Sequence, residues 1–90
     1  MLHLDLGKPA ESFLSKLPQK QQGQIWRKLF QIQDNPFPND VKKLRGYPYV
    51  RVDVGEFRIV YHTQDALLIV RIIGKRNDDD VYKKLKRMEG

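Results

Sequence analysis

VRVDVGEFRIVYHTQDALLIVRIIGKRNDDDVY, residues 50–82, carries the pattern that decides the fold of this chain. Residues 49–54 and 56–63 alternate apolar and polar side chains, which is typical of strands with one buried face. The short connection at Gly55-Glu56 predicts that these two strands form a β-hairpin. Residues 67–73 are almost wholly apolar, and a strand that is covered on both faces usually lies centrally in its sheet. The stretch therefore predicts three consecutive strands of one sheet.

The residues before this stretch predict one strand and two helices. Residues 1–6 alternate and indicate a further half-buried strand. Residues 9–17 begin with a proline, which suits the first turn of a helix, and the proline that follows them ends that helix and can open the next. Residues 34–40 and 41–48 are rich in turn residues and are predicted to be loops, the second of them basic. The second helix, residues 18–33, has a predicted buried face made of Ile25, Trp26, Leu29, Phe30 and Ile32.

After the third strand the chain turns at the basic corner Gly74-Lys75-Arg76 and enters a last helix over residues 78–87. Asn77 or Asp78 can cap this helix. Lysines toward its end, Lys84 among them, suit the negative end of its dipole. The predicted order is strand, helix, helix, strand, strand, strand, helix. We therefore expect an α+β fold: an N-terminal helical hairpin packed on a small, mainly antiparallel, twisted sheet, with a short C-terminal helix.

Composition limits the classes of function. Ninety residues without a repeat or linker predict a single domain, residues 1–90. The chain has no cysteine, which excludes disulfides and thiolate metal sites. The longest wholly apolar run, residues 66–70, is too short to span a membrane, and the N-terminus has no signal-peptide pattern. We expect a cytoplasmic protein without a membrane partner.

Positive charge is concentrated in the second half of the chain, which has a formal net charge of +6. Residues 1–41 carry five basic and four acidic side chains, whereas residues 42–90 carry twelve basic and seven acidic ones. Such asymmetry favours a polyanionic partner, either nucleic acid or an acidic protein. The alternative is a generally basic protein that has no such partner.

Cationic side chains gather on the predicted polar face of the sheet. The alternation places Arg51 and Arg58 there, and Arg76 and Tyr82 follow at the corner and in the last helix. RNA cleavage without a metal requires positive charge at the non-bridging phosphate oxygens and proton transfer at the 2′- and 5′-oxygens. The three arginines can supply that charge, and Tyr82 can stack on a base or take part in proton transfer. The same arginines could also form an ordinary solvated face.

Four segments resemble the RelE/ParE family of small toxins from bacterial and archaeal toxin–antitoxin pairs: residues 44–47, 54–61, 74–76 and 80–82. The resemblance covers nearly the whole chain, because the predicted order of elements also matches. RelE-like members cut mRNA in the ribosomal A site without a metal, whereas ParE-like members inhibit DNA gyrase. The retained lysine, arginine and tyrosine of the last two segments favour the RelE-like branch. The resemblance implies no cofactor.

The resemblance also implies a role for each basic residue. Arg58 matches the arginine that contacts the scissile phosphate, Arg76 a second transition-state stabiliser, and Tyr82 the tyrosine that stacks on the substrate base. Arg51 stands where RelE has the first lysine of a Lys-x-Lys pair. Contacts with RNA and the ribosome are implied for Lys42, Lys43, Arg45 and Lys75.

Asp53 departs from the family pattern, because it stands where RelE has the second lysine, a participant in proton transfer. A carboxylate cannot donate to phosphate at neutral pH. It either acts as a base or forms an ion pair with Arg51 or Arg58, and the ion pair is the favoured interpretation. His62 shares the face of Arg58, and a histidine can exchange protons near neutral pH. A lone histidine on a strand is nevertheless more often a surface residue.

Three functions follow as hypotheses: a ribosome-dependent mRNA endonuclease, a gyrase inhibitor, and a catalytically inactive RNA-binding protein. The implied partners are the ribosome with its mRNA and an acidic antitoxin. Such an antitoxin has a segment that is disordered when free and that covers the basic face or displaces the last helix. No metal site is expected, because the two histidines are far apart in the sequence and the acidic residues 78–80 are typical of the start of a helix.

Overall fold

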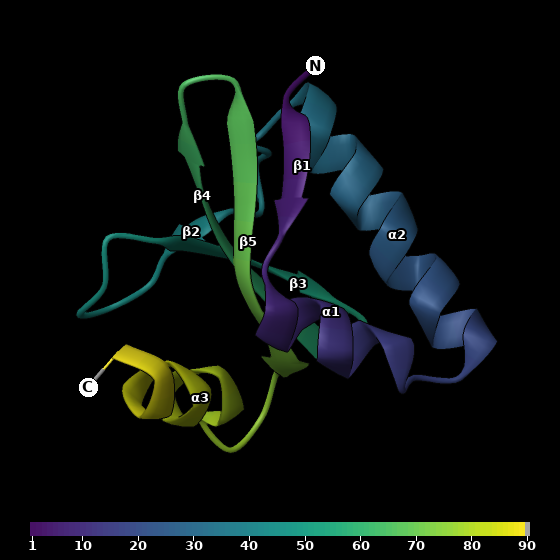
Figure 1. The fold of residues 1–90 in the computed structure, drawn as a ribbon, viewed down its shortest axis with the longest axis vertical. Helices are drawn as coiled ribbons and strands as arrows, with labels where there is room; N and C mark the ends of the chain where they lie inside the picture. The colour runs from purple at the N-terminus through teal and green to yellow at the C-terminus, as the bar shows by residue number, and fades with distance from the viewer. Residues whose placement is uncertain (90) are drawn as a thin grey trace.

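The computed structural model describes residues 1–89, which form three helices and one five-stranded sheet (Figure 1). The helices are α1 (Lys8–Ser15), α2 (Gln19–Asp34) and α3 (Asp80–Glu89). The strands are β1 (His3–Leu6), β2 (Lys42–Lys43), β3 (Val50–Val54), β4 (Phe57–Gln64) and β5 (Leu67–Lys75). Their order in the sheet is β1-β5-β4-β3-β2, and β1 pairs with β5 in parallel while the other pairs are antiparallel. The predicted α+β fold is confirmed.

The alternation in β3 and β4 fixes which side chains share a face. Val52 lies opposite Ile59, and Asp53 lies opposite Arg58. Gly55 turns the hairpin with a φ of +56°, a conformation that glycine adopts without a steric penalty. The apolar pair therefore points to one side of the sheet and the charged pair to the other.

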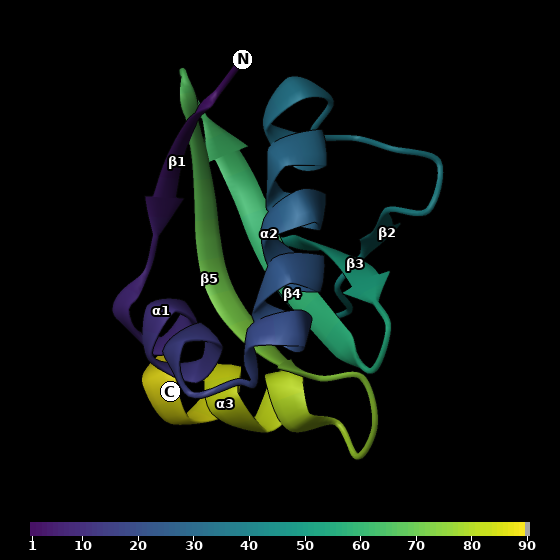
Figure 2. The same cartoon turned by 90° about the vertical axis from the view of Figure 1, so that its right-hand side faces the viewer.

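Each face of the sheet carries its own apolar core. Figure 2 shows α1 and α2 along one side of the sheet and α3 across its lower end. β4 contributes to both cores, because Ile59 and Tyr61 belong to the larger one and Val60 to the smaller one. Buried members of the larger core include Leu14, Ile25, Leu29, Leu68 and Val70. The smaller core consists of Leu44, Val60, Ile72, Val81 and Leu85.

The buried face of α2 is narrower than its sequence predicts. Ile25, Leu29 and Ile32 are fully buried, as their helical spacing requires. The prediction was wrong for Phe30, which is 55% exposed, because it lies about 100° around the helix from Leu29 at 3.6 residues per turn. Trp26 is partly buried against the larger core and stacks on the Phe30 ring at 6.0 Å.

The predicted loop over residues 41–48 contains a short strand. Lys42 and Lys43 pair with Arg51 and Val50 to form β2 at the sheet edge. Two residues are too few to show a period of two, so the sequence pattern could not indicate them. Leu44, which directly follows β2, is buried in the smaller core, and its N–H donates to the carbonyl of Tyr49 at 3.0 Å.

The last helix begins two residues later than predicted. Asp78 and Asp79 have φ values of +63° and +54°, which a right-handed helix excludes. Asp80 opens α3 instead, and its carboxylate accepts a hydrogen bond from the backbone N–H of Lys75 at 2.8 Å. At its other end the helix reaches Glu89, two residues beyond the predicted end.

Tyr61 fastens the loop after α2 to the sheet. Its ring is fully buried, and its hydroxyl donates a hydrogen bond to the carbonyl of Pro36 at 2.6 Å. Burial raises the pKa of Tyr61 to about 12. This tyrosine is a core residue and is not accessible to stack on a base.

Candidate nucleic-acid interface

Arg58 on β4 and Asp53 on β3 form the centre of the polar face. The Asp53 carboxylate accepts hydrogen bonds from Nε of Arg58 at 2.8 Å and from Nη2 at 3.4 Å. Nη1 of Arg51 lies 3.9 Å from the same carboxylate. The predicted ion pair of Asp53 is confirmed. Because a guanidinium has five N–H donors, Arg58 keeps donors that a phosphate could use.

β5 extends two residues beyond the predicted strand, so Gly74 and Lys75 of the basic corner are its last residues and Arg76 follows it. The corner lies at the same end of the sheet as Arg58. Gly74 is the cross-strand partner of Arg58, and the backbone N–H of Arg76 donates to the carbonyl of Glu56 at 2.9 Å. Lys75 and Arg76 are exposed. Within residues 1–89, the Arg76 side chain makes no ion pair. Within the described residues, the Arg76 guanidinium is therefore without an ion-pair partner, and Arg76 follows the strand end that lies beside Arg58.

Tyr82 on α3 is partly buried and packs against the smaller core. Its hydroxyl accepts a hydrogen bond from the backbone N–H of Arg45 at 3.3 Å. Its ring lies 6.4 Å from that of Tyr47, tilted by 45°. The structure thus joins Tyr82 to the loop between β2 and β3. The stacking role of Tyr82 stays a prediction.

Lys42, Lys43 and Arg45 extend the positive charge to the edge of the sheet. Lys42 is the cross-strand partner of Arg51, so its side chain continues the polar face. All three are exposed, and in the described part of the chain none of them makes an ion pair. Their contacts with RNA or the ribosome stay predictions.

His62 is not brought together with the arginine–aspartate pair. It lies on the same strand as Arg58 but further along it, at a separation of roughly 13 Å for a rise of about 3.3 Å per residue. Its ring lies 5.2 Å from that of Tyr49. A proton-transfer role beside Arg58 therefore has no support from the geometry.

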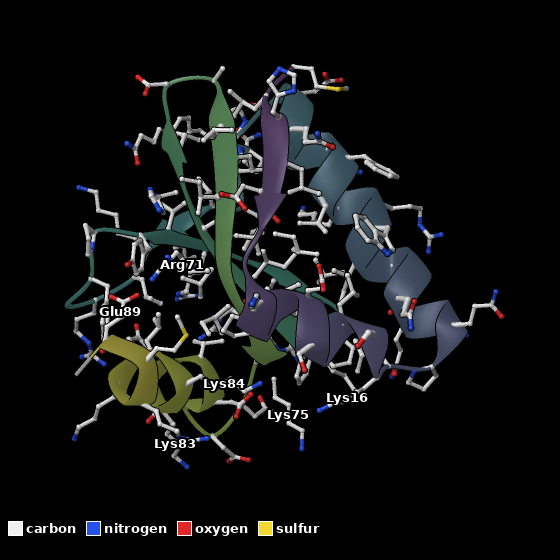
Figure 3. The ribbon with its side chains drawn as sticks, in the orientation of Figure 1. Lys16, Arg71, Lys75, Lys83, Lys84 and Glu89 are labelled. Carbon is white, nitrogen blue, oxygen red and sulfur yellow. The ribbon has the colours of Figure 1, made fainter. Side chains whose placement is uncertain are left out.

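Glu89 closes a second polar cluster at the end of α3. Its carboxylate accepts a hydrogen bond from Nη2 of Arg71 at 2.8 Å, and the Tyr49 hydroxyl donates to its two oxygens at 3.0 and 2.8 Å. Figure 3 shows Arg71 from β5 and Glu89 from α3 lying together. The Arg71 guanidinium also lies over the Tyr49 ring, 5.7 Å from its centroid. We call Arg71, Tyr49 and Glu89 the clasp.

The clasp shifts the proton affinities of its members. The hydrogen bond from Arg71 holds the pKa of Glu89 below its ordinary value, against the opposing effect of partial burial. Burial, reinforced by the hydrogen bond to Glu89, raises the pKa of Tyr49. The sequence contained one signal for this cluster, since Arg71 is the single charge in an apolar strand and a half-buried charge needs a partner.

Acid is expected to loosen the clasp. The pKa of Glu89 is lower in the folded state than its ordinary value of 4.5. The contribution of Glu89 to the free energy of unfolding is therefore fully present above pH 4.5 and is lost as the pH falls through the folded-state pKa. The contribution should stay below about 1 kcal/mol, because both side chains of the pair remain partly exposed to solvent. Urea unfolding from about pH 5 to about pH 3 should show a smaller loss of stability in Glu89→Gln than in the wild type. The exposed Glu11→Gln on α1 is the control, and an equal loss in Glu89→Gln and the wild type would contradict the role of Glu89.

The start of α3 is held by Asp80 and Lys84. Nζ of Lys84 lies 3.2 Å from the Asp80 carboxylate, 3.3 Å from the carbonyl of Ile73 and 3.8 Å from the centroid of the Phe13 ring. Partial burial acts to raise the pKa of Asp80, but the N–H of Lys75 and the Lys84 ammonium outweigh it and lower the pKa. Lys84 was predicted to complement the negative end of the helix dipole, but it lies before the last turn of α3. It instead fastens α3 to β5 and α1.

Among residues 1–89, no group of three or more histidine, cysteine or acidic side chains is placed to hold a metal ion. None of the described helices is long and apolar enough to cross a membrane.

The fold is similar to those of solved toxin structures. The isolated RelE toxin of E. coli is 26% identical, with 98% of this chain and 99% of that chain covered and a TM-score of 0.74. The chain is RelE-like. A double arginine-to-alanine mutant of E. coli RelE in the free state gives a TM-score of 0.78 at 24% identity, with 99% of this chain and 98% of that chain covered.

A RelE-like fold also occurs in a toxin bound to its antitoxin. The RelB–RelE complex of Methanococcus jannaschii matches with 25% identity and a TM-score of 0.64, over 84% of this chain and 91% of that chain. No protein-family model matches the chain, and no curated protein sequence matches it. The resemblance predicted from the sequence motifs is confirmed by these structures.

Proposed function

We propose that this RelE-like chain is the toxin of a toxin–antitoxin pair and cleaves mRNA in the ribosomal A site without a metal ion. The observation that carries the proposal is the arrangement of arginines at one end of the sheet. Arg58, oriented by Asp53, lies on β4, and Arg76 directly follows the end of β5, whose Gly74 is the cross-strand partner of Arg58. A phosphate placed at that end would meet both guanidinium groups.

The chemistry follows from these groups. The 2′-hydroxyl of a nucleotide loses its proton, and its oxygen forms a bond to the adjacent phosphorus. The bond from phosphorus to the 5′-oxygen breaks, and that oxygen takes up a proton. Negative charge grows on the non-bridging oxygens, and the N–H groups of Arg58 and Arg76 stabilise it. Asp53 acts as a positioning residue, because its bidentate contact sets the direction of the Arg58 side chain. Arg51 adds charge to the same face.

The proposed partners are the ribosome with its mRNA and an acidic antitoxin. The net charge of +6 would attract either polyanion at long range. The complex of RelB and RelE from Methanococcus jannaschii supports an antitoxin partner. Lys42, Lys43, Arg45 and Lys75 are the proposed RNA and ribosome contacts.

The test is a purified translation reaction on a defined message, with the RNA ends mapped with and without ribosomes. We expect new ends inside the A-site codon only when ribosomes are present. We expect the same cleavage from protein that was treated with a chelator and then separated from it before ribosomes are added. Intact message in every lane would contradict the proposal. If the message stays intact and the same protein preparation inhibits DNA supercoiling by gyrase, the protein would be a gyrase inhibitor instead.

A further inference from the structure

We propose that the loop of residues 44–49 is a second base-binding subsite, which takes an unpaired RNA nucleotide next to the one at Tyr82. We call it the tyrosine loop. This inference rests on the proposed action on RNA and deepens it. The family resemblance implies RNA contacts for Lys43 and Arg45, but it assigns no base-binding role to Tyr47 or Tyr49. The ligand class is single-stranded RNA, bound through its base and a flanking phosphate.

The tyrosine loop has a defined shape. The backbone N–H of Leu44 donates to the carbonyl of Tyr49 at 3.0 Å, and that of Tyr47 donates to the carbonyl of Leu44 at 3.2 Å. Gly46 has a φ of +84°, which lets the chain reverse here. Residues 43–50 line a hollow of about 530 Å³, a size within the range of small-ligand sites.

Two tyrosines supply a stacking surface beside this hollow. The Tyr47 and Tyr49 rings lie 6.1 Å apart and within 10° of parallel. Tyr49 is immobilised by the clasp, because Glu89 binds its hydroxyl and Arg71 lies over its ring. Tyr47 rests on this fixed ring and remains partly exposed. The exposed part of the Tyr47 ring is the surface proposed to accept a base, and stacking on tyrosine tolerates any base.

The charge around the loop suits a nucleotide. Residues 41–52 contain four basic side chains and no acidic one. Lys43 and Arg45 border the hollow, and within the described chain neither makes an ion pair. An aromatic wall with unneutralised cations at its rim matches a base with its phosphate better than it matches an uncharged peptide.

The subsite is continuous with the proposed cleavage face. Tyr82 touches the loop in two ways: its hydroxyl accepts from the N–H of Arg45, and its ring lies 6.4 Å from Tyr47. Neighbouring rings place neighbouring bases side by side. A base bound at Tyr47 would therefore belong to a nucleotide adjacent to the one at Tyr82, and the loop would contribute to the grip on the message.

The experiment measures binding of a fluorescein-labelled, unstructured oligoribonucleotide of about ten nucleotides to the isolated protein, without ribosomes. Tyr47→Ala should weaken binding about tenfold, the effect expected for one base–aromatic stack, and Tyr47→Phe should restore it. The slope of the logarithm of the binding constant against the logarithm of the salt concentration should become shallower by about one in Lys43→Ala. Tyr47→Ala should leave this slope unchanged. Phe30→Ala, which removes an exposed aromatic ring from α2, is the matched control.

The outcomes separate this subsite from the proposed nuclease. Equal binding by Tyr47→Ala and the wild type overturns the subsite, whatever the ribosome assay shows, and so does an absence of binding by the wild type. Tyr47-dependent binding without cleavage on ribosomes keeps the subsite and removes the nuclease. A loss in Tyr47→Ala confined to an acidic peptide, with RNA binding intact, would make the loop a protein-docking surface and overturn the proposal.

Discussion

Arg76→Ala is expected to lower ribosome-dependent cleavage by about 10²- to 10³-fold, the usual effect of removing one preorganised donor from a transition-state charge. The fold should be unchanged. The side chain is exposed and makes no ion pair within residues 1–89. The backbone N–H of Arg76 donates a hydrogen bond to the carbonyl of Glu56, and the substitution leaves this hydrogen bond in place. The measurements are the cleavage rate at saturating programmed ribosomes and the urea midpoint.

The control removes a positive charge elsewhere. Lys8 is exposed at the start of α1, on the face opposite the arginines, and Lys8→Ala should cut at the wild-type rate. Full-rate cleavage by Arg76→Ala would show that the corner has no part in the chemistry. An equal loss in both variants would mean that overall charge, not a placed guanidinium, drives activity.

Asp53 allows the roles of charge and proton transfer to be distinguished. If the carboxylate only positions Arg58, Asp53→Asn should keep cleavage within about tenfold of the wild type, because the amide oxygen can still accept from the guanidinium. If the carboxylate is a general base, the loss should reach about 10²- to 10⁴-fold. The bidentate geometry to Arg58 favours the first result.

How much the sequence could predict depends on the range of the interaction. An ion pair of Asp53 with Arg51 or Arg58 follows from two alternating strands and the length of one turn, so the sequence predicted the pair but left its partner open. The structure shows Arg58 as the nearer partner. The lone charge of Arg71 indicated that a partner was needed, but the sequence could not identify Glu89 as that partner. The contact depends on how α3 is rotated when it packs on β5, and no local pattern encodes that rotation. Lys84 illustrates this limit: the sequence predicted that it complements the helix dipole, yet it binds the carbonyl of Ile73 and faces Phe13.

The packing of α3 depends on a glycine that the sequence shows only as part of the basic corner. A Cβ added at Gly74 would lie 2.6 Å from Oδ2 of Asp80, 3.2 Å from Cγ1 of Val81 and 3.3 Å from Nζ of Lys84. The Asp80 oxygen cannot simply swing away, because it accepts from the N–H of Lys75 and pairs with Lys84. Gly74 thus permits the close approach of α3 to β5.

Gly74→Ala is therefore expected to destabilise the protein by about 1–3 kcal/mol, the usual cost of overpacking a tight contact. α3 is attached mainly by the buried side chains of Val81 and Leu85, each worth about 1.5–3 kcal/mol. The loss is comparable with one of these anchors, so hydrogen exchange should quicken in α3 first while the larger core stays protected. Cleavage should fall as well, because α3 carries Tyr82 and follows Arg76.

Gly23→Ala supplies the matched control for this substitution. Gly23 lies inside α2, and a Cβ there would meet Nη1 of Arg27 at 3.6 Å, which is ordinary contact. Alanine is the better helix former by about 1 kcal/mol, so this variant should be more stable than the wild type. Urea unfolding should thus move in opposite directions for the same chemical change. If Gly74→Ala were as stable as the wild type, α3 could shift without loss, and its contacts could not be what holds Tyr82 against the tyrosine loop.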